Sequence, residues 1–452
     1  MKRIFSWSTA RGILLGFALV ILLGSLLLSL PFASADGKGV SYPDALFTAA
    51  SATCVTGLVT VTTATAWSWF GQAVILLLIQ IGGLGVVTVT TGMMLLFHRR
   101  LGLTDRLFIQ DSFNLDTLSG LVRFVKKVLL GTGIVEGIGA LCYLPAFLPR
   151  FGARGIWAAI FQSVSAFCNA GMDLIGENSL VGFAADPWVC GVTCALILLG
   201  GVGFLVWWDV LRVLGARRTG NRRRLWGALS LHSRIALSAT AFLLLAGTAL
   251  FLLFESHNPL TLQGRPFGEQ LLAAFFQSVT TRTAGFATIL QENLSPASVV
   301  VSLVLMFIGG SPVSTAGGIK TVTAAILCAA ALSVVRSREQ VVLFGRAVDP
   351  KTVLRALAVC LCSFCTALVS TLLLAQFVQA PLADLLYETI SATATVGLSR
   401  ALTPALPVAG KLIMSATMLF GRVGPISLAT ALGGKGSQDH CVKAPVESVR
   451  VG

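Results

Sequence analysis

The stretch Thr53-Cys-Val-Thr-Gly57 occurs in four related copies along this chain. The other copies read Phe167-Cys-Asn-Ala-Gly171, Thr281-Arg-Thr-Ala-Gly285 and Thr393-Ala-Thr-Val-Gly397, and the glycines lie 114, 114 and 112 residues apart. Similar lead-ins precede them, starting at Phe47, Phe161, Phe276 and Tyr387, and the third lead-in is one residue shorter. A repeat of this length predicts four equivalent walls around one axis.

Loops of Thr, Val, Ala and Gly around an axis suit the binding of a dehydrated cation by backbone carbonyl oxygens. Glycine is needed there because the backbone must turn sharply without a Cβ in the way. The alternative is that each glycine is a packing contact between membrane helices. Four copies in register favour the ion filter.

The composition indicates a membrane protein. The chain has 452 residues, of which 55% are hydrophobic and only 12% are charged, whereas soluble domains have about 25% charged residues. The net charge of +14 would suggest nucleic acid in a soluble protein. Here an excess of basic residues in cytoplasmic segments explains it better.

Eight apolar stretches approach or exceed the ~20 residues that a membrane helix needs. They are Gly12–Leu30, Trp69–Phe97, Val128–Leu148, Trp188–Leu211, Ile235–Phe254, Ser298–Leu332, Thr352–Val378 and Val408–Leu432. If they alternate across the membrane, 24 of the 33 Lys and Arg residues fall on one side. This side is predicted to be cytoplasmic and to hold both termini of a multi-pass protein of the cell (inner or plasma) membrane. A cleaved signal peptide ending near Ala33-Ser-Ala35 is the alternative for the first stretch.

The fold class expected from these patterns is an all-α membrane protein with four tandem helix–pore helix–filter–helix modules around one pseudo-fourfold pore. It would have eight spanning helices and four re-entrant loops. The pore helices are expected at Pro43–Ala52, Ile156–Phe167, Gly268–Val279 and Pro381–Ala392. Each points the negative end of its dipole at a filter loop, where a cation is stabilised. In the first, Ser41, Pro43 and Asp44 have the residue types of a helix start.

The expected division of the chain follows these modules. Pore module 1 is 1–97, module 2 is 128–211, module 3 is 235–335 and module 4 is 352–434, joined by an amphipathic linker 98–127, a basic loop 212–234 and a loop 336–351, with a tail 435–452. The Arg217–Arg224 tract is more typical of a contact with anionic lipid than of a binding site, although docking of a partner is an alternative.

Two features mark a barrier inside the membrane. The span Ser298–Leu332 is interrupted by small residues from Gly309 to Gly318, and broken helices at membrane depth are typical of ion or substrate sites. A simple kink, the alternative, would need only Pro312. Arg422 lies inside the last span, where a charge is costly and indicates function. The corresponding positions elsewhere are Gly82-Gly83, Gly200-Gly201 and Gly309-Gly310.

These motifs resemble the pore-forming subunits of the Trk/Ktr/HKT potassium-transport superfamily, and within it the Ktr type. The resemblance covers nearly the whole chain and rests on Ala45–Gly57, Leu78–Gly85, Ser165–Gly171, Thr281–Phe286, Gly309–Lys320, Thr395–Leu398 and Phe420–Pro425. The lack of additional helices before Gly12 favours the Ktr type. The resemblance implies a homodimer on a cytosolic ring of nucleotide-binding regulatory subunits, with no cofactor in this chain itself.

The resemblance implies potassium uptake, since the first filter glycine is Gly57 rather than the serine of some sodium-favouring relatives. The expected filter residues are Thr53, Cys54, Val55, Thr56, Gly57, Cys168, Asn169, Ala170, Gly171, Arg282, Thr283, Ala284, Gly285, Ala394, Thr395, Val396 and Gly397. The expected gate residues are Gly309, Gly310, Ser311, Ser314, Thr315, Gly317, Gly318, Lys320 and Arg422. Potassium would lose its water near Asp173, and the side chain of Arg282 would lie behind the filter. Cys54 and Cys168 depart from the expected Thr or Asn.

Two other classes of function were weighed. An ion-coupled secondary transporter would have a buried coupling acid, for which Glu136 is a candidate, but four parallel filter loops fit it poorly. An enzyme would need a nucleophile or a metal cluster, and the ten cysteines follow no zinc or disulfide spacing. The chain also has no phosphate-binding Gly-x-x-x-x-Gly-Lys-[Ser/Thr] motif, so nucleotide control would require a partner chain.

Overall fold

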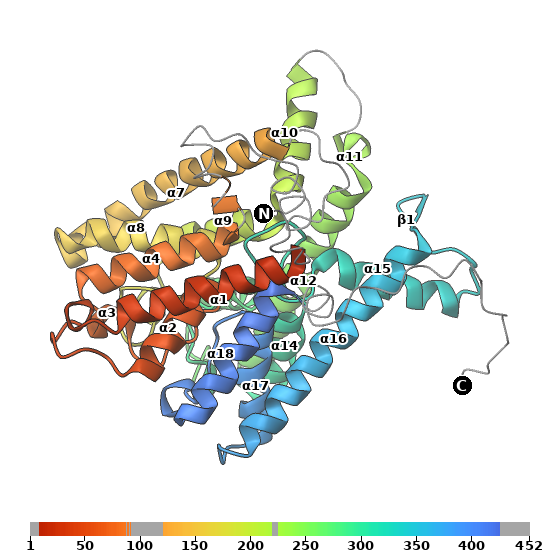
Figure 1. Cartoon of the computed structure of the whole chain (residues 1–452). Helices are drawn as coiled ribbons and strands as arrows, with labels where there is room; N and C mark the ends of the chain where they lie inside the picture. Colours follow the sequence, from red (N-terminus) through yellow and green to blue (C-terminus); the bar gives the residue numbers. More distant parts are fainter. Residues whose placement is uncertain (1–8, 87, 90, 92–120, 219–224, 425–452) are drawn as a thin grey trace, which may run out of the picture.

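The computed structural model describes residues 9–424 apart from 87, 90, 92–120 and 219–224. These residues form helices and one two-stranded hairpin (Figure 1). The predicted tail 435–452 lies outside the described residues, as do most of the predicted linker 98–127 and the arginines of 219–224.

The first two modules each start with a long helix, followed by a shorter one and a glycine loop. Module 1 contains α1 (Thr9–Leu28), α2 (Tyr42–Cys54), α3 (Thr63–Ala66) and α4 (Trp69–Leu84), and module 2 contains α7 (Leu121–Phe151), α8 (Arg154–Cys168), α9 (Pro187–Val202) and α10 (Phe204–Arg218). The predicted stretch Trp69–Phe97 is not one helix, because α4 ends before Gly85, which has φ +85°.

The last two modules repeat this order. Module 3 contains α12 (Leu231–Glu255), α13 (Phe267–Thr280), α14 (Pro296–Phe307) and α15 (Thr321–Val335), and module 4 contains α16 (Pro350–Ala375), α17 (Leu382–Thr393) and α18 (Val408–Val423). The single turn α11 (Leu225–Ala228) precedes α12, and the hairpin β1 (Val342–Leu343) and β2 (Arg346–Ala347) precedes α16. As predicted, the apolar stretch from Ser298 is broken, here by the loop of residues 308–320.

Four helices in the described part of the chain are long and apolar enough to cross a membrane, namely α1, α7, α12 and α16. A fifth crossing is possible by length if α9 and α10, which meet at 96°, count as one span. The outer faces of the long helices carry exposed leucines, such as Leu130 on α7 and Leu245 on α12, the latter 72% exposed. In water such faces would be unfavourable, whereas lipid covers them at no cost.

The modules contact one another in chain order, and the last contacts the first. Trp157 of α8 donates a hydrogen bond to Gln72 of α4 over 2.9 Å. Between modules 3 and 4, Tyr387 donates to the side chain of Gln291 over 2.9 Å. The ion pair from Lys411 of α18 to Asp44 of α2 spans 2.6 Å and joins module 4 to module 1. Between modules 2 and 3, the backbone N–H of Ala287 donates to the Ser179 hydroxyl over 3.3 Å. The four modules therefore form a closed ring.

The start of α2 differs in detail from the prediction. Ser41 occupies the N-cap position, but its hydroxyl makes no capping hydrogen bond to the helix backbone. It donates to the carboxylate of Asp44, the same carboxylate that binds Lys411. The predicted helix-start residues therefore also contribute to the joint between modules 1 and 4.

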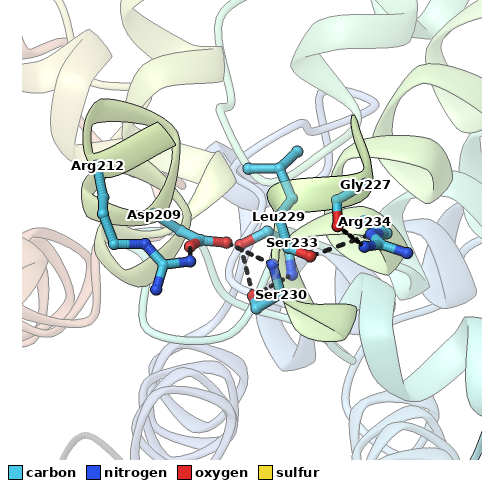
Figure 2. Close-up of polar contacts among 7 residues, drawn as sticks. All are labelled: Asp209, Arg212, Gly227, Leu229, Ser230, Ser233 and Arg234. Atoms are coloured by element: carbon cyan, nitrogen blue, oxygen red, sulfur yellow. Dashed lines mark hydrogen bonds and ion pairs between the residues drawn. The ribbon is translucent and has the colours of Figure 1, made fainter. Parts of the chain in front are cut away.

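The predicted span Trp188–Leu211 is not one straight helix, because the chain turns by 96° between α9 and α10. Gly203 makes the turn at φ +99°, a conformation that L side chains rarely adopt. Figure 2 shows how the end of this turn is fixed: Asp209 accepts from Arg212 and from the backbone N–H of Ser230 at 2.9 Å. Arg234 in turn donates to the Leu229 carbonyl over 3.1 Å. The start of α12 is thereby tied to α10.

The elements that join modules 2, 3 and 4 lie on one side of the bundle. In Figure 1, α10, α11 and the β1–β2 hairpin project at the end opposite α3 and α17. The rings of Trp226 in α11 and Phe344 at the hairpin tip make an edge contact, with centroids 6.2 Å apart. This side corresponds to the basic segments that were predicted to be cytoplasmic.

Candidate functional site

The four short helices α2, α8, α13 and α17 lead directly into the four glycine loops, which are residues 53–57, 167–171, 281–285 and 393–397. In each loop, the residue two positions before the glycine adopts the left-handed backbone conformation. These residues are Val55, Asn169, Thr283 and Thr395, with φ between 51° and 68°. Three of the four, Val55, Thr283 and Thr395, are β-branched and therefore strained in this conformation, and such strain is typical of functional sites. The sequence repeat is therefore also a repeat of backbone geometry.

A hydroxyl residue at the end of each short helix supports the loop that follows. Ser51 and Ser391 accept hydrogen bonds from the backbone N–H groups of Gly57 and Gly397, at 3.1 and 3.0 Å. The hydroxyl of Ser165 donates instead to the Met172 carbonyl. These hydroxyl residues recur within the repeated lead-ins, but they were not among the predicted filter residues.

Module 3 shows how the shorter lead-in is accommodated. Thr280 stands five residues before Gly285, whereas the serines of the other modules stand six residues before their glycines. Its hydroxyl donates to the Phe286 carbonyl over 2.5 Å, and its own carbonyl accepts from the N–H of Ala284 at 3.0 Å. The missing residue is thus absorbed at the end of α13, and the loop keeps its support.

The four glycines lie against one another in a ring. A methyl group added at Gly57 would lie 2.5 Å from the carbonyl oxygen of Ala170, and one added at Gly171 would lie 2.8 Å from that of Ala284. The same holds for Gly285 against Val396 at 2.6 Å and for Gly397 against Thr56 at 2.1 Å. Each glycine thus touches the loop of the next module, and the fourth touches the first. No side chain fits at these positions.

Arg282 contacts the first helix of its own module. Its guanidinium donates to the hydroxyl of Thr240 on α12 over 3.3 Å, and only 5% of the residue is exposed. Asp173, which was expected near the outer mouth, is also buried, and it accepts from the N–H of Ile175 at 3.1 Å. Its carboxylate therefore braces the segment after the second loop.

The helices that follow the glycine loops, α4, α9 and α18, carry glycines that let them approach the ends of the short helices. Methyl groups at Gly82, Gly200 and Gly421 would lie 2.0, 1.9 and 2.1 Å from the carbonyl oxygens of Thr53, Phe167 and Thr393. Each of these carbonyls belongs to the residue four positions before the loop glycine, so the contact is equivalent in modules 1, 2 and 4. In module 3 the equivalent glycine, Gly309, instead meets the Gly317 carbonyl, at 2.1 Å.

Residues 308–320, here called the inner loop, lie directly against the glycine loops. The N–H of Gly317 donates to Thr283 over 3.2 Å, and the hydroxyl of Thr315 donates to the Phe167 carbonyl over 3.0 Å. The inner loop also bonds to the end of α9, where Ser311 and Thr315 donate from their backbones to Gly201 and Gly200. A methyl group at Gly317 would also lie 2.5 Å from the Ala394 carbonyl oxygen, so this ordered loop meets three of the four glycine loops.

Arg422 connects the inner loop to module 1. Its guanidinium donates to the Thr315 carbonyl and to the Gly82 carbonyl, both at 2.6 Å, and to the Gly83 carbonyl at 3.2 Å. Lys320, at the other end of the loop, donates to the Ala316 carbonyl over 2.6 Å. The structure thus brings together the residues that the sequence assigned to a barrier.

A cavity of about 830 Å³ lies beside the inner loop, which contributes residues from Pro312 to Lys320 to its wall. Arg422 and Lys320 line it, together with α18, α15 and α16 residues such as Phe420, Ile326 and Arg355. Thr393 and Ala394 of the fourth glycine loop line it as well, so the cavity adjoins both the inner loop and a glycine loop.

In the described part of the chain, the His, Cys, Asp and Glu residues form no group of three or more that could hold a metal ion. The nine described cysteines are free thiols, and Cys54 and Cys168 are buried.

The comparisons with known proteins agree with this arrangement. The family model described as "TrkH: Cation transport protein" matches residues 19–443. The "Potassium/sodium uptake protein NtpJ" of Enterococcus hirae is 38% identical over 443 residues, which cover 97% of this chain and 96% of that protein. The "Ktr system potassium uptake protein B" of Bacillus subtilis is 37% identical, covering 91% of this chain and 90% of that protein.

A solved structure shares the fold. The potassium transporter TrkH of Vibrio parahaemolyticus aligns with a TM-score of 0.75 at 18% identity, covering 96% of this chain and 86% of that one. The family match spans most of the sequence, and the relatives align over nearly their full length. The chain therefore belongs to the TrkH family of cation transport proteins.

Proposed function

We propose that this chain is the pore-forming subunit of a potassium uptake system, with the glycine ring as its selectivity filter. The ring itself carries the proposal, because four backbone loops meet where no side chain fits. Backbone carbonyl oxygens at such a place replace the hydration shell of a cation. The relatives named as potassium uptake proteins support potassium as the ion.

In the proposed mechanism the cation lies at the carbonyl oxygens of residues 54–57, 168–171, 282–285 and 394–397. The helices α2, α8, α13 and α17 end at these loops, so the negative ends of their dipoles stabilise the ion. Passage depends on Thr56, Ala170, Ala284 and Val396, whose carbonyls lie next to the glycine of a neighbouring module.

The inner loop and Arg422 form the proposed gate. A guanidinium beneath the filter repels cations, and its hydrogen bonds hold the inner loop across the path. Opening requires the inner loop to leave Thr283 and Phe167, both of which belong to glycine loops. Movement of the gate would then also change the contacts that support the filter loops.

The assembly is proposed to be a homodimer in the cell membrane with eight spans per chain and both termini cytoplasmic. The share of basic residues on one side supports this orientation. The name "Ktr system" of the relatives suggests further subunits, and we propose a cytosolic nucleotide-binding ring as the partner.

The test is K⁺ against Na⁺ uptake in potassium-uptake-deficient cells, for the wild type and for Gly57→Ser. We expect the wild type to restore growth at low K⁺ and the variant to lose discrimination between the ions, since the added side chain displaces the Ala170 carbonyl. Failure of both chains, with and without a regulatory subunit from the Ktr system, would reject the proposed function.

A further inference from the structure

A buried acid lies behind the second glycine loop. Glu136, in the middle of α7, is 9% exposed. One oxygen of its carboxyl lies 3.2 Å from the side-chain nitrogen of Gln80 on α4, which donates to it. The other lies 3.7 Å from the sulfur of Cys168, within hydrogen-bond range for a thiol. The carboxyl thus joins two modules at the start of one filter loop.

Packing alone does not require an acid at this position, as module 3 shows. The hydroxyl of Ser163 on α8 donates to the Glu136 carbonyl over 2.6 Å, and that of Ser278 on α13 donates to the Leu244 carbonyl over 3.0 Å. One turn further on, Gly139 and Gly247 face these same two hydroxyls. Glu136 and Leu244 are therefore equivalent, and leucine suffices for the contact between the helices.

The contact with Cys168 connects the acid to the filter. Cys168 is the last residue of α8, and Asn169, Ala170 and Gly171 follow it directly. A methyl group at Gly83 would lie 2.6 Å from the Cys168 sulfur, so the thiol fits between α7 and α4 with no spare room. Gly83 also accepts from Arg422. A shift of the thiol would therefore move the backbone of the loop that follows it and the end of α4 that it contacts.

The cost of burying Glu136 suggests that its carboxyl has a function. Ionisable groups at membrane depth are expensive and seldom serve packing alone. None of the three ion pairs among the described residues includes it. Its described partners are an amide and a thiol, so its hydrogen bonds, rather than a charge pair, are what it contributes.

We propose that Glu136 is a selectivity-determining positioning residue of the second filter loop. Its carboxyl holds Cys168 against α4 and fixes the backbone of Asn169–Gly171 at the spacing the ion requires. The inference rests on the proposed function, because it assigns Glu136 a role in that same filter. Loss of the carboxyl lets the loop relax, so that ions of other sizes are accommodated.

The test compares Glu136→Leu, which copies module 3, with Glu136→Gln, which keeps a hydrogen-bonding group of the same shape. The full-length chain is reconstituted in liposomes, and K⁺ and Na⁺ fluxes are measured separately. We expect Glu136→Leu to lower the K⁺/Na⁺ flux ratio roughly fivefold, the size of one lost hydrogen bond, and Glu136→Gln to restore most of it. An unchanged ratio in folded Glu136→Leu protein would overturn the proposal.

Two cysteine variants keep the proposal testable if Glu136→Leu does not fold. Cys168→Ala removes the group that the carboxyl contacts, whereas Cys194→Ala changes another buried thiol, on α9. We expect a lower flux ratio only for Cys168→Ala, and equal ratios in both variants would contradict the proposal. A wild-type chain that carries no K⁺, with or without a regulatory subunit from the Ktr system, would instead reject the proposed function, so the two failures are distinguishable.

Discussion

The glycine ring and the layer beneath it are built from the same four modules in opposite ways. In the ring, all four modules contribute the same left-handed residue and the same glycine contact. In the layer beneath, one module contributes the inner loop, one contributes Arg422 and two contribute the ends of α4 and α9. A cation needs ligands from all sides, whereas a barrier needs only one movable part. Under the proposed function, this difference separates the selection of the ion from the gating of its passage.

The largest effect is expected from a side chain placed in the glycine ring. Gly397→Ala would put a methyl group 2.1 Å from the Thr56 carbonyl at a residue with φ +94°. We expect K⁺ uptake to fall more than tenfold, because the clash moves a proposed ligand and the left-handed backbone costs about 1–2 kcal/mol. Radiotracer uptake in cells with matched protein amounts measures the effect.

Gly264→Ala is the matched control for that variant. Gly264 has φ +82°, but a methyl group there meets nothing within 4 Å. It therefore carries the backbone cost without the clash, and uptake should stay within about twofold of the wild type. Equal losses in both variants would mean that backbone strain, and not the ring contact, explains the effect.

The next variant addresses the asymmetric layer. Arg422→Ala removes the hydrogen bonds to Thr315, Gly82 and Gly83, and hydrogen bonds to charged groups contribute about 1.5–3 kcal/mol each. We expect basal K⁺ uptake to rise several-fold as the inner loop is released. Unchanged uptake would count against a gate, and Arg422→Lys, which keeps the charge but has no fork geometry, should lie between the two.

The sequence predicted the four-part plan because its signals are local. The glycine motif recurs with its lead-in, so α2, α8, α13 and α17 lie within about two residues of the predicted half-helices. The break from Gly309 to Gly318 can likewise be predicted from the local sequence, without knowing which segments pack against it. For the candidate site, the pattern identified the residues that meet, including Arg422 and Thr315.

What the sequence did not predict depends on contacts between distant segments. The 96° turn at Gly203 occurs inside an apolar stretch that predicts one span. A Cβ at Gly203 would lie 2.5 Å from the Pro312 carbonyl oxygen, which explains why this residue is glycine. The contact of Glu136 with Cys168 joins residues of two helices, and neither has a distinctive spacing. Such features follow from the packing of modules and not from periodicity.

A smaller effect is expected where glycine serves only the approach of helices. Gly200→Ala would place a methyl group 1.9 Å from the Phe167 carbonyl and 2.7 Å from the Thr315 hydroxyl. We expect destabilisation by about 1–3 kcal/mol, typical of overpacking, and a partial loss of uptake. On the same helix, Gly191→Ala meets nothing within 4 Å and should be neutral or slightly stabilising. Thermal unfolding in detergent distinguishes the two, and equal melting temperatures would refute the close approach of α9.

The smallest effect is expected at the joint that closes the ring, far from both layers. Lys411→Met breaks the ion pair with Asp44, whose two side chains are each 15% exposed. Because the pair lies between the exposed and buried limits, the loss should be about 1–3 kcal/mol of unfolding free energy. The K⁺/Na⁺ flux ratio should not change, since the ring contacts remain. Exchanging the two residues, as Lys411→Asp with Asp44→Lys, should recover part of the stability. A change in the flux ratio would show that the filter depends on ring closure as well as on its own loops, and would remove the separation between the symmetric ring and the modules that support it.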